Sequence, residues 1–162
     1  MKTRLAKLLS LSLLAATAVP VVAIEDSSSV SVGVAGWAVF DQFDQFGAHL
    51  DYQHSPLETW WGLQPRAVII LVEQNQQYYG IGAAKAFDIS TNWSWGIASH
   101  VGYVHNVDTL GYDLEFYSFL FAKYRISRHH ALRGEIGHIS NAGFGDKNPG
   151  SETLVFSYTY HF

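Results

Sequence analysis

The last eleven residues, ETLVFSYTYHF (Glu152–Phe162), alternate large apolar side chains with smaller or polar ones. Side chains two residues apart on a β-strand lie on the same face. One face would therefore carry Leu154, Phe156, Tyr158, Tyr160 and Phe162. The other face would carry Thr153, Val155, Ser157, Thr159 and His161. The first face suits contact with lipid, and the second suits the interior of a barrel.

The same alternation recurs in eight stretches of about ten residues, the strand number and length of a small closed barrel. They lie at Val30–Phe40, Gln45–His54, Arg66–Gln74, Gln77–Ile89, Trp93–His105, Asp113–Ile126, His130–Asn141 and Glu152–Phe162. The connections 90–92 and 127–129 are short and 143–151 is longer, an asymmetry typical of outer-membrane barrels. We therefore predict an all-β fold, an eight-stranded antiparallel transmembrane β-barrel of the outer membrane.

Charged residues fall on the predicted inner face of the sixth and seventh stretches. The inward positions are Glu115, Lys123, Arg125, Arg133 and Glu135. The outward positions include Leu114, Phe116, Leu120, Ile126, Leu132 and Ile136. An eight-stranded barrel has room inside for side chains only, so this filling predicts a core and not a pore. A soluble periplasmic sandwich or barrel is the alternative, but only 15% of residues are charged, which favours lipid outside.

The N-terminal segment predicts export. A basic start, Met1–Lys7, precedes an apolar stretch, Leu8–Ala18, that is too short to span a bilayer. We expect a cleaved signal peptide at residues 1–23, with Ala16–Ala18 as an alternative cleavage site. The roughly 139 residues that follow suit one domain, a barrel at 24–162.

The composition argues against several other classes of protein. The chain has no cysteine, so an exported protein of this sequence must be stabilised by packing or by a membrane and not by disulfides. Its net charge is -4 and it has no basic run, which argues against binding to nucleic acid. No apolar run is long enough for a transmembrane helix.

The segment HISNAGFGDKNPGSE (His138–Glu152) holds the candidate functional residues. His138 and Ser140 fall on the outward face of the seventh stretch, and Glu152 falls on the outward face of the eighth. A hairpin register that pairs His138 with Glu152 would bring their Cβ atoms to about 4.5–5.5 Å. A charge facing lipid costs about 2–4 kcal/mol at mid-bilayer and much less near an interface. We therefore expect these residues near the outer end of the barrel.

These residue types suit acyl transfer. Ser140 would attack an ester carbonyl, His138 would take the serine proton and Glu152 would orient the imidazole. The next residues, 141–143, offer a side-chain amide and backbone N–H groups for the oxyanion. The alternative is that 141–150 is only a turn, because Asn, Gly, Asp and Pro are the commonest turn residues.

The motif resembles the lipid A 3-O-deacylase family of Gram-negative outer-membrane enzymes, known as PagL. The resemblance is carried by HISNAG at 138–143, by Asn148 ten residues after His138 and by Glu152 fourteen residues after it. It extends to the leader, the eight strands and the terminal Phe162, which is similar to the assembly signal of bacterial outer-membrane proteins. The resemblance spans nearly the whole chain.

The resemblance implies a reaction and its residues. It implies three catalytic residues, the base His138, the nucleophile Ser140 and the orienting acid Glu152. It implies that Asn141 and the Gly143 region stabilise the oxyanion and that Asn148 supports the active-site loop. The implied reaction is hydrolysis of the ester-linked 3-hydroxyacyl chain at position 3 of lipid A, a modification of lipopolysaccharide. No metal and no other cofactor is implied, and the partner is lipid A or lipopolysaccharide on the outer leaflet.

Two other functions stay open from the residues alone. The chain could be a non-enzymatic small barrel, such as an adhesin or a structural protein, with the segment 141–150 as a plain loop. It could also be another lipid esterase or an acyltransferase, because the same triad serves ester chemistry generally. A homodimer could shield or gate the site.

The remaining polar and aromatic residues have plainer interpretations. His129 and His130 are adjacent and would point to opposite faces, so we expect a periplasmic turn there and not a metal site. His49, His100 and His161 take inward positions. Interfacial girdles, and not a sugar-binding platform, are expected for Trp60, Trp61, Trp93, Trp95, Tyr103 and Tyr117. Candidate contacts with lipid A phosphates are Arg66, Lys85, Arg128 and Lys147, of which Lys147 is the best placed.

Overall fold

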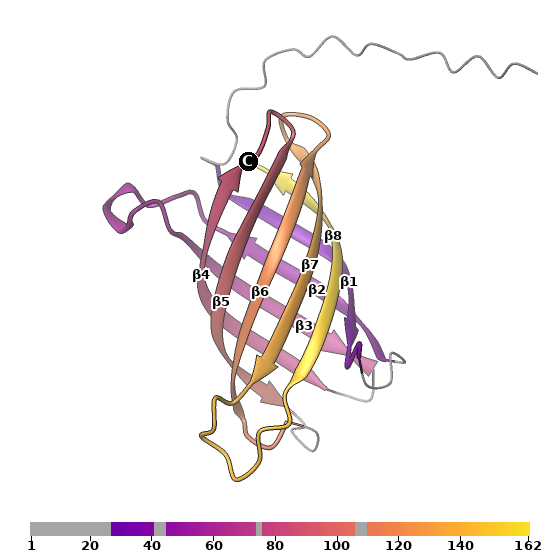
Figure 1. The fold of residues 1–162 in the computed structure, drawn as a ribbon. Helices are drawn as coiled ribbons and strands as arrows, with labels where there is room; N and C mark the ends of the chain where they lie inside the picture. The colour runs from indigo at the N-terminus through magenta and orange to yellow at the C-terminus, as the bar shows by residue number, and fades with distance from the viewer. Residues whose placement is uncertain (1–26, 41–44, 74–75, 106–109) are drawn as a thin grey trace, which may run out of the picture.

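A computed structural model of the chain describes residues 27–40, 45–73, 76–105 and 110–162, so the expected signal peptide at 1–23 lies outside the described residues. Eight antiparallel strands form one closed barrel, in which β1 also pairs with β8 (Figure 1). The strands are β1 (Ser29–Trp37), β2 (Gln45–Gln53), β3 (Gln64–Val72), β4 (Gln77–Asp88), β5 (Trp93–His105), β6 (Leu114–Arg125), β7 (His130–Ser140) and β8 (Ser151–His161). A short 3-10 helix, η1 (Glu58–Trp60), lies between β2 and β3. The predicted fold is confirmed.

The predicted strand limits agree with the structure to within a few residues. β1 ends at Trp37 and not at Phe40, because Ala38 has a φ of 53°, which leaves the extended region. β3 begins two residues earlier than predicted, at Gln64, and carries Pro65 within it.

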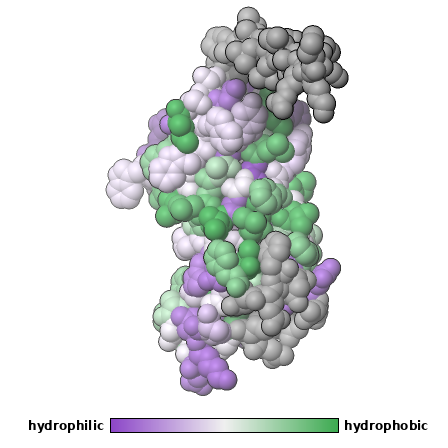
Figure 2. Space-filling view, turned by 45° about the vertical axis from the view of Figure 1, so that its right-hand side comes forward, coloured by the Kyte–Doolittle hydropathy of each residue, from purple (hydrophilic) through white to green (hydrophobic). Residues whose placement is uncertain are grey.

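The two faces of the strands separate as the alternation predicts. In β8, Phe156, Tyr158 and Tyr160 are exposed, and the residues between them are buried. Many of the outward residues are apolar, and on the face seen in Figure 2 apolar residues gather at the middle of the molecule. No helix in the described ranges is long and apolar enough to cross a membrane.

Of the six residues expected in the aromatic girdle, five are exposed and one, Tyr117, is buried. Trp93, Trp95 and Tyr103 are exposed on the outer wall. Tyr117, in contrast, is fully buried in the lumen, where its hydroxyl accepts a hydrogen bond from the Thr153 hydroxyl at 3.0 Å. The correction follows from parity, because Tyr117 lies two residues from the inward Glu115 and so shares its face.

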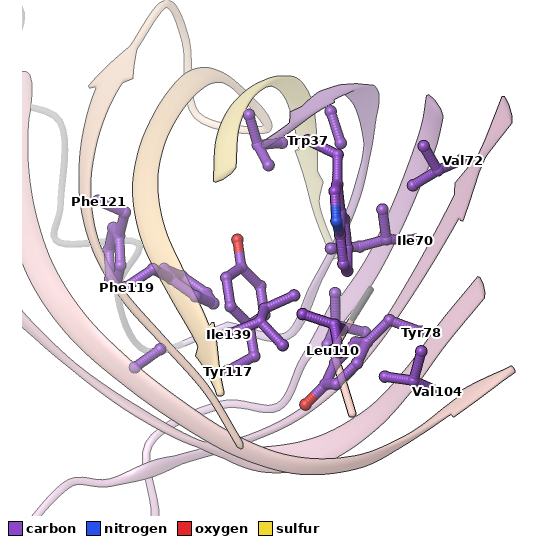
Figure 3. Packing of buried hydrophobic residues seen from close by; sticks show 14 of the residues in the cluster. Trp37, Ile70, Val72, Tyr78, Val104, Leu110, Tyr117, Phe119, Phe121 and Ile139 are labelled. Carbon is purple, nitrogen blue, oxygen red and sulfur yellow. The ribbon is translucent and has the colours of Figure 1, made fainter. Parts of the chain in front are cut away.

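Aromatic and aliphatic side chains fill much of the lumen, including Trp37, Tyr78, Tyr117, Phe119 and Ile139 (Figure 3). Buried charges fill the rest in opposite-sign contacts. Asp51 accepts from Arg66 at 2.5 Å and from Arg133 at 3.2 Å. Arg133 also lies 2.5 Å from Glu135. The interior is therefore a packed core, as expected for eight strands.

The two ends of the barrel differ. The C-terminus and the short turns after β4 and β6 lie at one end, and the β7–β8 connection at 141–150 lies at the other (Figure 1). In bacterial outer-membrane barrels the short turns are periplasmic and the longer loops extracellular. This orientation places the end of β7 and the start of β8 on the extracellular side.

Candidate active site

His138 and Glu152 face each other on the outer wall. β7 and β8 pair in the register that puts His138 directly opposite Glu152, as predicted. The His138 Nδ1 lies 3.3 Å from the Glu152 Oε1, and the two side chains are 52% and 32% exposed. If Nδ1 carries the proton that Glu152 accepts, Nε2 is the unprotonated nitrogen of a neutral imidazole. The carboxylate thus leaves Nε2 available as a base.

Ser140 lies on the same face as His138, two residues further along β7. Its side chain is half-buried where β7 ends. Within the described residues no hydrogen bond joins Ser140 to His138. Hydrogen bonds between catalytic residues are often long without substrate and tighten only in the reacting complex. The structure therefore places all three predicted residues together and links two of them directly.

The loop after Ser140 is organised by the buried side chain of Asn141. Its amide nitrogen donates to the backbone oxygens of Leu110 at 3.2 Å and of Lys147 at 2.7 Å. Its amide oxygen accepts from the Gly143 backbone N–H at 2.9 Å. Asn141 therefore holds the loop shape, and its amide group and the Gly143 N–H are already paired.

Asn148 is fixed from the other side of the loop. Its amide oxygen accepts a hydrogen bond from the backbone N–H of Asn141 at 3.1 Å. A backbone N–H pairs with the oxygen of a side-chain amide, so the NH2 group of Asn148 points elsewhere. Asn148 is thus an exposed residue anchored directly beside Ser140.

Gly150 packs against the ring of His138. Its φ is +69°, and a Cβ atom at this position would lie 2.6 Å from His138 Cε1 and 3.1 Å from Nε2. Only a glycine tolerates both this backbone conformation and this approach. The ring is thus held between the Glu152 carboxylate at Nδ1 and the Gly150 backbone near Cε1 and Nε2.

We expect Gly150→Ala to lower the rate of ester hydrolysis by about 10²-fold, because displacing a reacting group by roughly 1 Å has that effect. The fall should appear in kcat and not in KM. Gly62→Ala is the matched control, because Gly62 also has a positive φ, of 71°, and lies far away between η1 and β3. Hydrolysis by equal amounts of folded protein checks the prediction, which fails if the two variants are equally active.

A row of polar side chains crosses the outer wall at the level of His138. Ser99 on β5 lies opposite Ser118 on β6, and Ser118 lies opposite His138 on β7. The two serine hydroxyls lie 2.9 Å apart. Together with Glu152, this row interrupts an otherwise apolar surface on four adjacent strands. Ser99 is hydrogen-bonded to Ser118, and His138 contacts Glu152. These contacts reduce the free-energy cost of placing polar groups against lipid.

An apolar hollow of about 310 Å³ starts beside His138 on this wall. It lies over β5, β6 and β7 and is lined by Ile97, Ser118, Phe119, Leu120, Ile136, Gly137 and His138. His138 therefore borders a surface that suits a hydrocarbon chain. Sequence patterns did not reveal this hollow, because its shape depends on three strands together.

The candidate phosphate contacts fall in different places. Lys147 is exposed in the extracellular loop beside the site. Arg66 is buried in the lumen with Asp51, so the prediction that it contacts lipid A was wrong. Lys85 donates to the backbone oxygen of Trp61, towards the periplasmic end. Arg128 lies in the short turn after β6, also at that end.

The other histidines lie away from this site. His49, His100 and His161 are buried on the inner face, as predicted. His130 contacts the Tyr158 hydroxyl, and His129 pairs with the backbone oxygen of His161 at 3.0 Å. Among the residues described, no group of three or more potential ligands could hold a metal ion.

The fold and the site together define a class: a small outer-membrane β-barrel with a histidine, a glutamate and a serine on its lipid-facing wall. The chain belongs to the lipid A 3-O-deacylase (PagL) family, whose model matches residues 29–161. It is thus a lipid A deacylase of the outer membrane, and the family predicted from the sequence is confirmed.

Solved structures show the same fold. A crystal structure of the outer-membrane enzyme PagL is similar, with a TM-score of 0.64 and 17% identity over 81% of this chain and 97% of that one. A de novo designed transmembrane β-barrel has a TM-score of 0.63 and 14% identity over 85% and 96%. The Yersinia pestis outer-membrane protein Ail has 0.56 and 16% over 85% and 99%. A comparison with curated protein sequences gave no significant match.

Proposed function

We propose that the chain hydrolyses the ester-linked 3-hydroxyacyl chain at position 3 of lipid A, with Ser140 as nucleophile, His138 as base and Glu152 as orienting acid. One observation carries the proposal: the His138–Glu152 pair stands on the lipid-facing wall, two residues from a serine. A structural barrel has no need for a half-exposed histidine–glutamate pair there. Family membership supplies the lipid A substrate.

The chemistry follows from the geometry. His138 Nε2 takes the hydroxyl proton of Ser140 as the oxygen attacks the ester carbonyl. The tetrahedral intermediate collapses, the sugar oxygen leaves with the proton from His138, and an acyl-serine remains. Water, deprotonated by His138, then attacks this ester. The products are a free 3-hydroxy fatty acid, the regenerated serine and lipid A with one free hydroxyl.

Asn148 is the side chain best prepared to stabilise the oxyanion. The side-chain amide of Asn141 and the N–H of Gly143 are already paired within the loop. The Asn148 amide is anchored through its oxygen to the residue after Ser140, which leaves the NH2 group to donate. We therefore assign the oxyanion role to Asn148 and the supporting roles to Asn141 and Gly143, which exchanges the roles that the resemblance implied.

Substrate reaches this site sideways from the membrane. All three reactive side chains lie on the outer wall near the extracellular end, so the site faces the outer leaflet. Lys147 in the adjacent loop can meet a lipid A phosphate. The homodimer considered from the sequence stays a prediction.

We expect Asn148→Ala to lower kcat about 10²–10³-fold, the usual effect of losing one oxyanion donor. The barrel should stay folded, because Asn148 is exposed. Single-turnover release of fatty acid by the purified enzyme measures the change. A fall below threefold would remove Asn148 from the oxyanion role.

Mass spectrometry of lipid A from a Gram-negative host that expresses the chain tests the function. Loss of one 3-hydroxyacyl group from position 3 is the expected result. If the lipid A is unchanged while folded protein is present, the assay is repeated on detergent-solubilised enzyme with added lipid A. Failure there as well would refute the proposed function.

A further inference from the structure

The hollow beside His138 is the first of three that follow one another down the outer wall. The second, about 400 Å³, shares Leu120 and Ile136 with the first. The third, about 700 Å³, shares Ala122 and Gly134 with the second and reaches Trp93, Tyr124 and Leu132. Shared lining residues make the three hollows one groove over β6 and β7.

Two small residues keep this groove open at its middle. Ala122 and Gly134 face each other across β6 and β7. Their neighbours on the same level are bulky, Trp95 on β5 and Phe156 on β8. A Cβ atom on Gly134 would meet only the Phe156 ring, at 3.6 Å. The order large, small, small, large across four strands is what produces a channel here.

The length of the groove along the membrane normal matches the thickness of one membrane leaflet. It runs from His138 to Leu132, and six residues at about 3.3 Å each span roughly 20 Å along the strand. Strands of such barrels tilt by about 35–45°, so the length of the groove along the membrane normal is roughly 15 Å. Half of a hydrocarbon core of about 30 Å is the same length. An acyl chain that starts at Ser140 would therefore lie in the groove over its whole length.

We propose that Ala122 and Gly134 set the length of the acyl chain that the enzyme removes, by leaving the lower half of the groove open to long chains. The inference rests on the proposed function. The upper hollow, between His138 and Ile136, accommodates the carbons nearest the ester. Carbons further along must pass between Ala122 and Gly134 to reach the hollow lined by Trp93 and Tyr124. A larger side chain at either position would close this passage.

The test uses purified enzyme in detergent and lipid A species that differ only in the position-3 acyl chain, with ten, twelve, fourteen or sixteen carbons. The variants are Ala122→Leu and Gly134→Val. Both residues are on the outer wall, where a larger apolar side chain faces lipid. Ala67→Leu is the matched control, because Ala67 is an exposed outward alanine of β3, outside the groove. Heat-dependent gel mobility confirms that each variant is folded.

We expect both variants to lower kcat/KM for the sixteen-carbon substrate by about 10–200-fold, the range for a misfit of a methylene or more in an apolar pocket. The ten-carbon substrate should change by less than about threefold, and Ala67→Leu should keep the wild-type profile. Equal losses for all lengths, or an unchanged profile in folded variants, would overturn the inference. If one of the two variants fails to fold, the other variant alone tests the inference. A wild-type enzyme that releases no fatty acid from any species refutes the proposed function instead.

Discussion

Membranes that contain the Ser140→Ala variant should show lipid A with its position-3 acyl chain intact, and purified enzyme should lose at least about 10⁴-fold in kcat. The reason is that the acyl-enzyme needs the Ser140 oxygen, and neither His138 nor Glu152 can replace it. Ser140 is half-buried at a strand end, so removal of its hydroxyl leaves the barrel folded. Mass spectrometry of lipid A, beside the wild type at equal expression, measures the effect.

Two further variants sharpen this result. His138→Ala should be nearly as inactive as Ser140→Ala, because the serine proton then has no acceptor. Glu152→Ala should lose less, since in the proposed mechanism Glu152 orients the imidazole through Nδ1 and does not react. Full deacylation in Ser140→Ala membranes would rule out the mechanism. Equal loss in Glu152→Ala and Ser140→Ala would assign Glu152 a larger part than orientation.

The largest loss of stability is expected for Asp51→Ala. Asp51 is fully buried and lies 2.5 Å from Arg66 and 3.2 Å from Arg133, both of which are also buried. Removal of the carboxylate leaves these guanidinium groups without a shared counter-ion. Breaking a buried pair in this way costs about 3–5 kcal/mol of the free energy of unfolding. Urea unfolding of the barrel in detergent, followed by gel mobility, measures the loss.

Asp88→Ala is the control for this prediction. Asp88 lies 2.9 Å from Arg125 but is 48% exposed at the end of β4. Exposed ion pairs contribute about 0–1 kcal/mol, so this variant should unfold close to the wild type. If Asp51→Ala were as stable as Asp88→Ala, the buried charges would not be essential to the core. The lipid A assay should give normal activity for folded Asp88→Ala.

The alternation of side chains predicted most of the fold because one face of each strand meets lipid and the other meets a packed lumen. The same parity placed His138, Ser140 and Glu152 on one wall, and the cross-strand pair followed from the hairpin register. Parity also shows why Tyr117 is not in the girdle, since it shares the inward face with Glu115.

Contacts between distant segments could not be predicted in this way. Arg66 has the inward parity of β3, but its contact with Asp51 depends on the packing of the lumen. The hydrogen bond from Asn141 to Leu110 joins segments about 30 residues apart in the sequence. The hydrogen bond from Asn141 to Lys147 lies within a single loop. The approach of Gly150 to His138 is a matter of tenths of an ångström. Such details require coordinates.

The three residues proposed to react all lie on the β7–β8 hairpin, whereas closure of the barrel requires β1 and β8, which are far apart in the sequence. Contacts between residues close in sequence cost less chain entropy and form sooner than contacts between the ends. The hairpin can therefore bring His138 and Glu152 together before β1 arrives. Pairing of His138 with Glu152 and closure of the barrel are in this sense separate folding events, and the later one requires β1.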